Sequence, residues 1–239
     1  MSRFFVPSEN VKQKEIFVSG KENHHLVRVM RLKAKDDVVV FDNSGKEYYG
    51  IIKKVSSQET VIEIKKVQER KEQNKVEITL VQAIPKKAKI EDIIDKTTQL
   101  GIWGIIPMIT ERTIVRPSKE KAYLQRWQKI ALESCKQCGR AKPPYINDIV
   151  NFKDLISQNS QYDLALMPSL LGKRKGLKEI SLQKTKNIIF FIGPEGGWTN
   201  QEIELAEKNG VILVDLGERV LRTDTAAIAM TAILNFLVK

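Results

Sequence analysis

Two continuous apolar runs near the C-terminus, each followed by a glycine-containing turn, constrain the fold of this chain more than any other feature. The first run, 187–192 (NIIFFI), leads directly into 193–198 (GPEGGW), and the second, 211–214 (VILV), is closed by Leu216 and Gly217. Continuous apolar runs of this length are typical of strands buried on both faces, as in a parallel sheet covered by helices. We therefore expect an α/β domain with a ligand site outside the carboxyl ends of two neighbouring strands.

Each of these two turns is followed by a helical pattern. Thr199 and Glu202 form a capping box, in which each side chain can bond the backbone amide of the other residue, so a helix should begin near Asn200. Gly210 is placed to end that helix, and residues 226–238 predict a second, apolar helix. A single glycine-rich turn could be an ordinary tight turn. Two such turns at strand ends favour a binding site, since glycine permits positive φ and close approach to a ligand.

The alternation of strand and helix already begins at residue 76. A buried strand is predicted at 76–83, and apolar residues at helical spacing over 90–100 predict a helix that ends at Gly101. Further strands are expected at 105–108 and 162–167. This β-α-β order is typical of a parallel sheet, and the strand 162–167 should end at the same edge as the two glycine turns.

Residues 1–70 alternate with a period of two and predict a small β domain. Its expected strands are 4–6, 16–18, 38–41, 48–55 and 61–67, with a hairpin turn at 43–45 (NSG). Eight consecutive polar residues, 68–75, are the clearest linker signal in the chain. We therefore expect a β domain at 1–70 and an α/β domain at 76–239.

A short helix is predicted between the strands of the β domain. Leu26, Val29 and Met30 lie at helical spacing and should share the inner face. Arg28 and Arg31 should then lie on the opposite face together with His24. On the residues alone, a surface or capping role for His24 and His25 is the simpler interpretation.

The charge of the chain favours a polyanionic partner. Lys and Arg total 40 against 29 Asp and Glu, which gives a net charge of +11. Between Arg112 and Lys142 there are nine basic and two acidic residues, a local charge of +7. Such a run is usually a solvated helix face, but beside a ligand site it could neutralise several phosphates of a nucleic acid. Trp103 and Trp127 could stack on bases, although their spacing favours the core.

Several other classes of function are not supported by the sequence. Cys135 and Cys138 form a C-x-x-C pair at the end of a helical pattern, and the histidines that could complete a zinc site are far away in the chain. We expect no metal. Neither glycine turn matches a P-loop or a dinucleotide fingerprint. We find no apolar run long enough to span a membrane and no signal peptide, so we expect no membrane partner and a cytoplasmic location.

The glycine turns resemble the signatures of a known family. The segments 192–197 (IGPEGG) and 216–226 (LGERVLRTDTA) are similar to those of the RsmE family, which are SPOUT-class RNA methyltransferases. The resemblance implies a C-terminal domain with a parallel sheet and a trefoil knot, preceded by a small PUA-like, RNA-binding β-barrel. It also implies a homodimer that methylates N3 of a uridine in 16S ribosomal RNA of the small ribosomal subunit with S-adenosyl-L-methionine. Asp224 stands where the family more often has glutamate, which preserves the charge.

The resemblance also suggests roles for individual residues. The cofactor would contact Leu166, Met167, Pro168, Ile192, Gly193, Pro194, Glu195, Gly197, Leu216, Gly217, Val220, Leu221, Arg222, Thr225 and Ala226. RNA would contact Arg3, His24, Arg28, Arg31, Arg112, Arg116, Arg126 and Arg140. Arg222 is the candidate to stabilise negative charge on the base or to orient a phosphate, and Glu195 is the candidate to assist removal of the N3 proton. The alternatives are a related methyltransferase with another RNA target and a non-catalytic RNA-binding or ribosome-assembly module.

Overall fold

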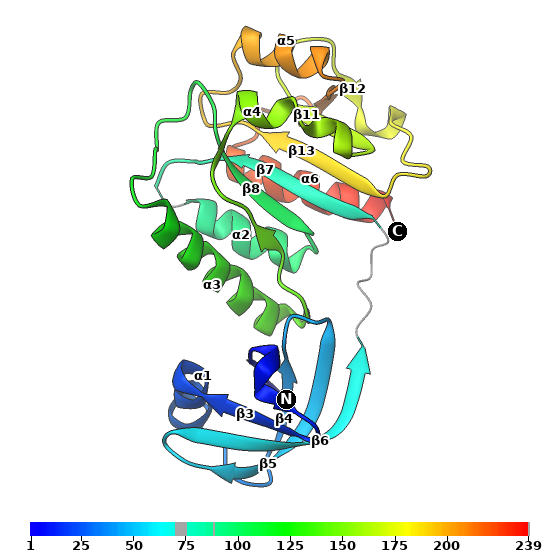
Figure 1. Ribbon diagram of the computed structural model, residues 1–239. Helices are drawn as coiled ribbons and strands as arrows, with labels where there is room; N and C mark the ends of the chain where they lie inside the picture. Colours follow the sequence, from blue (N-terminus) through cyan, green and yellow to red (C-terminus); the bar gives the residue numbers. More distant parts are fainter. Residues whose placement is uncertain (70–75, 88, 239) are drawn as a thin grey trace. The chain divides into compact units, whose positions relative to one another are not determined.

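A computed structural model describes residues 1–69, 76–87 and 89–238 and divides the chain into two units (Figure 1). The first comprises Met1–Glu72 with Leu132–Pro143, and the second comprises Gln73–Ala131 with Pro144–Lys239. Most of the predicted linker 68–75 lies outside the described residues. The grouping of Leu132–Pro143 with the first unit was not anticipated from the sequence. These residues begin inside a continuous helix, where composition gives no sign of a boundary.

The first unit contains one six-stranded sheet with strand order β1-β4-β5-β6-β3-β2. Its strands are β1 (Ser2–Phe5), β2 (Val11–Lys12), β3 (Glu15–Ser19), β4 (Asp37–Phe41), β5 (Lys46–Val55) and β6 (Glu59–Glu69). The pairing of β1 with β4 is parallel, and the other pairings are antiparallel. The predicted hairpin turn is confirmed, since Asn43 and Gly45 have φ of 69° and 88° between β4 and β5.

The sheet of the first unit encloses its own apolar core. Strands β1, β3, β4, β5 and β6 all contribute to one cluster, which includes Phe4, Ile16, Val38, Ile52 and Ile62. All of these side chains are almost fully buried. A sheet that turns one face onto a shared core in this way is expected of a small barrel-like β domain.

The predicted inner face of the short helix in this unit is wrong at two positions. The segment consists of α1 (Gly20–His24) and a π-helical turn, η2 (His25–Val29). The amide of Met30 bonds the carbonyl of His25, and this wider turn changes the spacing assumed for an α-helix. Leu26 is buried as predicted, but Val29 and Met30 are 58% and 43% exposed.

The second unit contains an eight-stranded sheet in which every described pairing is parallel. Its strands are β7 (Glu77–Ala83), β8 (Gly104–Ile109), β9 (Tyr145–Ile146), β10 (Val150–Asn151), β11 (Leu164–Pro168), β12 (Lys175–Gly176), β13 (Asn187–Ile192) and β14 (Ile212–Asp215). The order is β10-β8-β7-β13-β11-β14-β12, with β9 beside β8. We expected β13 and β14 to be neighbours, but β11 lies between them. The trefoil knot implied by the resemblance stays a prediction.

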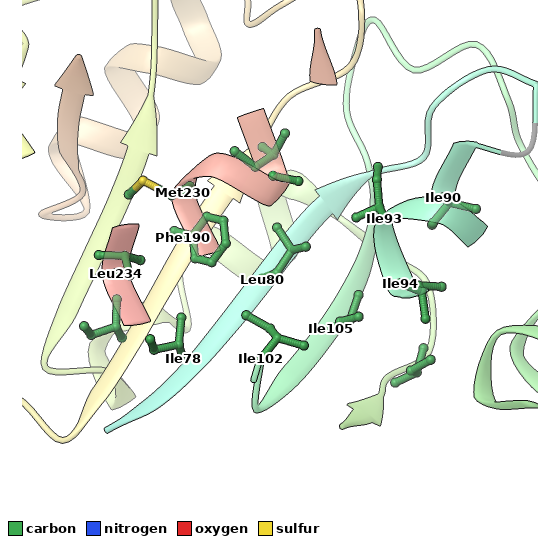
Figure 2. Packing of buried hydrophobic residues seen from close by; sticks show 14 of the residues in the cluster. Ile78, Leu80, Ile90, Ile93, Ile94, Ile102, Ile105, Phe190, Met230 and Leu234 are labelled. Carbon is green, nitrogen blue, oxygen red and sulfur yellow. The ribbon is translucent and has the colours of Figure 1, made fainter. Parts of the chain in front are cut away.

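Helices cover both faces of this parallel sheet. The helices of the second unit are α2 (Lys89–Gln99), α3 (Glu120–Cys138, whose end belongs to the first unit), α4 (Phe152–Ile156), α5 (Asn200–Lys208) and α6 (Thr223–Leu237). Short 3₁₀ turns lie at Ser8–Asn10, Asn159–Gln161 and Leu177–Glu179. Helices α2, α3 and α6 share a core with one sheet face, which Figure 2 shows around Leu80 and Phe190, and α4 and α5 cover the other face.

The predicted helix signals in this unit are confirmed. Glu202 accepts from the amide of Thr199 at 2.9 Å, and the Thr199 hydroxyl accepts from the amide of Glu202 at 3.2 Å, which completes the capping box of α5. Gly101 and Gly210 follow α2 and α5 with φ of 92° and 81°, as helix-ending glycines do. Trp127 is buried in the core, whereas Trp103 is half-buried.

Candidate functional site

A cavity of about 600 Å³ lies in the second unit, at the carboxyl ends of β11, β13 and β14. Its walls are formed by the loops that follow these strands, together with Lys89 at the start of α2 and Ala226 in the first turn of α6. The strand 162–167 was expected to end at this edge, and Pro168 at the end of β11 does line the cavity. Parallel strands therefore bring three separate loops to one site, as is usual for ligand sites in α/β sheets.

Most residues predicted to bind the cofactor line this cavity. They are Pro168, Ile192, Gly193, Pro194, Glu195, Gly197, Leu216, Gly217, Val220, Leu221, Arg222 and Ala226. Leu166 and Met167 do not, because their side chains alternate along β11 and are buried in the cores on opposite faces of the sheet. Thr225 is exposed in the first turn of α6 and does not line the cavity either. For these three residues, contact with a cofactor stays a prediction.

The loop after β13 depends on its glycines. A Cβ atom on Gly193 would lie 3.0 Å from the Trp198 ring, so a larger residue would displace the indole. Gly197 has φ of 68°, a left-handed conformation that glycine adopts without strain. The indole nitrogen of Trp198 donates to the carbonyl of Pro168 over 3.1 Å. Trp198 thus joins this loop to the end of β11.

A buried threonine joins the loop after β13 to the loop before α6. The Thr223 hydroxyl donates to the carbonyl of Gly193 at 2.7 Å and accepts from the side-chain amide of Gln82 at 3.0 Å. The same amide of Gln82 also donates to the carbonyl of Ala83 at 2.8 Å. Gln82 and Thr223 are both buried, so these hydrogen bonds are protected from competition with water.

The loop after β14 is held by a local hydrogen bond and an ion pair. The carboxylate of Asp215 accepts from the amide of Gly217 at 2.9 Å and lies 3.7 Å from the guanidinium of Arg174. Gly217 has φ of 108°, which again requires glycine. Asp215, the last residue of β14, also lines the cavity and places a negative charge at its wall.

The two residues predicted to be catalytic both line the cavity and are exposed. The carboxylate of Glu195 accepts from the backbone amide of Lys86 at 3.0 Å. Arg222 precedes the first residue of α6, and its guanidinium makes no ion pair with any described residue. The same holds for Arg219, which also lines the cavity. Two guanidinium groups are therefore available to a ligand.

Lys89 reaches the cavity wall from α2 and pairs with Asp224. Their charged atoms are 3.0 Å apart, and the side chains are 33% and 22% exposed. Burial alone would raise the pKa of Asp224, but the hydrogen bonds from Lys89 and from the amide of Thr225 outweigh it and lower the pKa. Asp224 is therefore ionised near neutral pH, and it keeps a compensating charge beside the Lys89 ammonium.

The arginines of the basic stretch after β8 differ in the contacts that they make within the protein. Arg112 donates to two carbonyl oxygens of the glycine loop, those of Gly196 and Trp198, at 2.7 and 3.2 Å. Arg126 makes two contacts of 2.8 Å with the carboxylate of Glu91, which already balances its charge. Arg116 is exposed. Binding of RNA by Arg112, Arg116 and Arg126 stays a prediction, and Arg116 has the least structural role of the three.

The RNA-binding candidates of the first unit also fall into two groups. His24, Arg28 and Arg31 are exposed on α1 and the residues that follow it. Arg3 is 15% exposed and forms an ion pair of 2.7 Å with Glu47, and it donates to the carbonyl of Arg140 at 3.1 Å. Arg3 is therefore held in place by structural contacts. Binding of RNA by any of these residues and by Arg140 stays a prediction.

Several residues that line the cavity were not among those predicted individually to bind the cofactor. They include Lys89, Arg112, Ser169, Leu170, Leu171, Trp198, Asp215 and Arg219. Asp215 could have been found, because it occupies the end of a predicted strand directly before the glycine turn. Lys89 could not, since only the tertiary fold brings the first turn of α2 to this cavity.

In the described ranges, no group of three or more His, Cys, Asp and Glu side chains is arranged to hold a metal ion. Cys135 and Cys138 are both free thiols, the first of them buried. None of the described helices combines the length and the apolar character needed to cross a bilayer.

Comparisons with known proteins agree with this arrangement. The model of a family described as an RNA methyltransferase domain matches residues 72–235, and that of an RNA methyltransferase PUA domain matches residues 18–65. The chain is 30% identical over 246 residues to ribosomal RNA small subunit methyltransferase E of Bacillus subtilis, covering 98% of this chain and 96% of that protein. It is 32% identical over 231 residues to the protein of the same name from Mesomycoplasma hyopneumoniae, covering 95% and 96%.

A solved structure is similar over the same extent. The ribosomal RNA small subunit methyltransferase E of Neisseria gonorrhoeae, bound to S-adenosyl methionine, has a TM-score of 0.90 and 29% sequence identity. The similarity covers 99% of this chain and 98% of the other. Both units of the fold therefore have counterparts in a protein that was crystallised with this cofactor.

Proposed function

The chain belongs to the RNA methyltransferase family, and on this premise we propose that it transfers a methyl group from S-adenosylmethionine to N3 of a uridine in 16S ribosomal RNA. The names of the relatives support an RNA of the small ribosomal subunit as the substrate. The choice of N3 rests on the resemblance of 192–197 and 216–226 to the RsmE family. The observation that carries the proposal is the cavity, to which two glycine loops contribute together with Arg219 and Arg222, whose guanidinium groups pair with no carboxylate among the described residues.

The residues around the cavity fit the cofactor. A volume of about 600 Å³ falls within the range of small-molecule sites. Apolar side chains such as Leu170, Ile192 and Leu216 suit an adenine ring. Backbone groups of the glycine loops can bond its edge and the ribose. Asp215, Glu195 and the cavity cations offer both signs of charge to the ammonium and the carboxylate of the methionine part.

The side chains at the cavity suit a reaction that depends on placement. When bound, S-adenosylmethionine would supply a methyl group on a positively charged sulfur, which would be left as a neutral thioether. N3 of the uracil would take the methyl group and lose its proton. Glu195 is the proposed acceptor of this proton, directly or through water. Arg222 is proposed to stabilise the negative charge that develops on the carbonyl oxygens of the base. Both roles are favoured by the exposure of the two side chains at the cavity, and that of Arg222 also by the lack of an ion pair with any residue that the structure describes.

The RNA is proposed to bind through exposed cations and to present an unpaired base. Arg28, Arg31 and Arg116 are exposed and can contact phosphates, which contribute affinity without sequence information. Specificity then depends on a base that is splayed out of single-stranded RNA into the cavity. The substrate places the proposed reaction in the cytoplasm, where ribosomes assemble.

The active protein is proposed to be a homodimer. This proposal rests on the family resemblance and on an apolar stripe along the end of α6, where Ile233, Phe236 and Leu237 are 38%, 78% and 39% exposed. Apolar side chains on one face of a helix are common where two copies of a chain meet.

The proposed reaction can be tested by mass spectrometry of ribosomal RNA nucleosides. Purified protein and S-adenosylmethionine are incubated with small ribosomal subunits that lack the modification. We expect 3-methyluridine at one position, and we expect Arg222→Ala to abolish it while leaving the fold intact. An exposed lysine away from the cavity provides a charge-matched control, Lys153→Ala, which should retain full activity.

Other products would identify the alternatives. Methylation at a different atom or nucleotide would point to a related methyltransferase with another RNA target. Binding of cofactor and RNA without any methylated product would contradict the proposed reaction and favour a binding or assembly module. Full turnover by Arg222→Ala with normal cofactor binding would contradict the role given to Arg222.

A further inference from the structure

Arg112 lies outside the glycine loop and donates two hydrogen bonds to it. One guanidinium nitrogen, Nη1, is 2.7 Å from the carbonyl oxygen of Gly196 and 3.2 Å from that of Trp198. These two carbonyls lie on either side of Gly197, the residue with φ of 68°. A cation that holds both oxygens therefore fixes the direction of the peptide groups around the left-handed residue.

The aliphatic part of Arg112 packs against the same loop. A Cβ atom on Gly196 would lie 3.3 Å from both Cβ and Cδ of Arg112, so the arginine stem covers this glycine closely. The preceding residue adds a further link, because the amide of Glu111 donates at 2.9 Å to the buried carboxylate of Glu202. That carboxylate also caps α5. The segment after β8 is thus attached to both ends of 196–202.

We propose that Arg112 is a positioning residue that holds the glycine loop 193–198 in the shape that binds the methyl donor. The inference rests on the proposed function, because it assumes that this loop contacts S-adenosylmethionine. In this role, the guanidinium of Arg112 holds the two loop carbonyls and does not serve as a contact for RNA phosphates. Gly196, Gly197 and Trp198 all line the cavity, so a change in their peptide groups alters the cavity wall directly.

A phosphate contact and a positioning role predict different results for Arg112→Ala. Loss of one phosphate contact weakens RNA binding and reduces the slope of log affinity against log salt by about one. Loss of a positioning residue weakens binding of S-adenosylmethionine instead. Removal of two hydrogen bonds at an exposed position should raise the cofactor dissociation constant roughly three- to tenfold.

The decisive experiment measures cofactor binding and loop protection without requiring turnover. Calorimetry gives the dissociation constant of S-adenosylmethionine for the unchanged protein and for Arg112→Ala, and hydrogen exchange reports the backbone amides within 193–198. For Arg112→Ala we expect weaker cofactor binding and faster hydrogen exchange in this loop. The slope of log RNA affinity against log salt should not change. Added guanidinium ion should partly restore binding of S-adenosylmethionine. Arg112→Lys, which keeps a donor of similar reach, should lie between the two proteins and provides a variant that conserves charge.

Two results would overturn the inference. The first is a cofactor dissociation constant within twofold of the unchanged protein, whatever happens to RNA binding. The second is unchanged exchange in 193–198. If the unchanged protein itself fails to bind S-adenosylmethionine, the proposed function is wrong, and hydrogen exchange alone then decides whether Arg112 holds the loop. The control Lys153→Ala should alter neither measurement.

Discussion

The hydroxyl of Thr223 donates to the carbonyl oxygen of Gly193 over 2.7 Å, which joins the first residue of α6 to the loop that follows β13. Gln82 from β7 donates to the same hydroxyl at 3.0 Å. Both side chains are buried, and the three residues come from separate parts of the chain. The geometry of the cavity therefore depends on hydrogen bonds made below its surface as well as on the residues that line it.

Replacement of Thr223 by valine should weaken both the fold and the cavity. Valine has a similar shape but leaves the Gln82 amide with one acceptor fewer and removes the donor to Gly193. Buried groups that lose a partner cost about 1–3 kcal/mol, so the free energy of unfolding should fall by about that amount. Urea denaturation measures this loss, and calorimetry should show weaker binding of S-adenosylmethionine. Thr223→Ser keeps the hydroxyl and should retain most of both properties. Equal stability of the valine variant would show that the hydrogen bond is not important.

Glu195→Gln separates the two roles that Glu195 can play. The glutamine oxygen can still accept from the amide of Lys86, so the structural contact is conserved. The carboxylate that is proposed to take the N3 proton is lost, so the methylation rate should fall by about 10²- to 10⁴-fold with little change in cofactor affinity. Single-turnover methylation of small subunits measures the rate. If the variant reacts at the normal rate across the pH range, Glu195 does not act as the base.

Local sequence signals predicted the helix and strand positions well, because they depend on neighbouring residues. The capping box of Thr199 and Glu202 and the glycine end at Gly210 are examples. The order of the strands was predicted less well, and β11 was not expected between β13 and β14. Parallel strands do not need to follow one another in the sheet, and their pairing depends on long crossovers that local patterns do not describe.

The candidate site was predicted where it is built from strand ends and missed where it is built from distant contacts. The glycine turns identified Gly193 and Gly217 as cavity residues. The contacts of Lys89 with Asp224 and of Arg112 with Gly196 join residues far apart in the chain, and basic residues in a polar stretch give no sign of such partners. A run of positive charge therefore indicated a nucleic-acid partner without revealing that Arg112 and Arg126 have contacts within the protein.

The pair formed by Lys89 and Asp224 predicts a dependence of stability on pH. The lowered pKa of Asp224 means that its contribution is complete above the ordinary value of 3.8 and is lost as the pH falls through the folded-state pKa. Asp224→Asn should therefore be less stable than the unchanged protein near neutral pH, by less than about 1 kcal/mol because the pair is partly exposed. The difference should shrink as the pH falls below about 4.

Denaturant unfolding at several pH values measures this difference. Asp148→Asn is a suitable control, since the exposed Asp148 forms no ion pair with a described residue. That variant should match the unchanged protein near neutral pH. A stability difference for Asp224→Asn that stays constant down to about pH 3 would show that the carboxylate charge is not the cause.

The apolar stripe at the end of α6 predicts that a single acidic substitution prevents association. Phe236 is 78% exposed, and large aromatic side chains at the centre of an interface contribute much of its binding energy. Phe236→Glu should therefore convert the proposed dimer into a monomer, because two copies of the glutamate would be buried near each other in a symmetric interface. Sedimentation equilibrium measures the molecular mass.

Val67→Glu is the control for this prediction. It changes a 50% exposed apolar residue of the first unit and should leave the dimer intact. Methylation by the Phe236 variant should fall together with association if a second subunit completes the active site, whereas a fully active monomer would contradict that expectation.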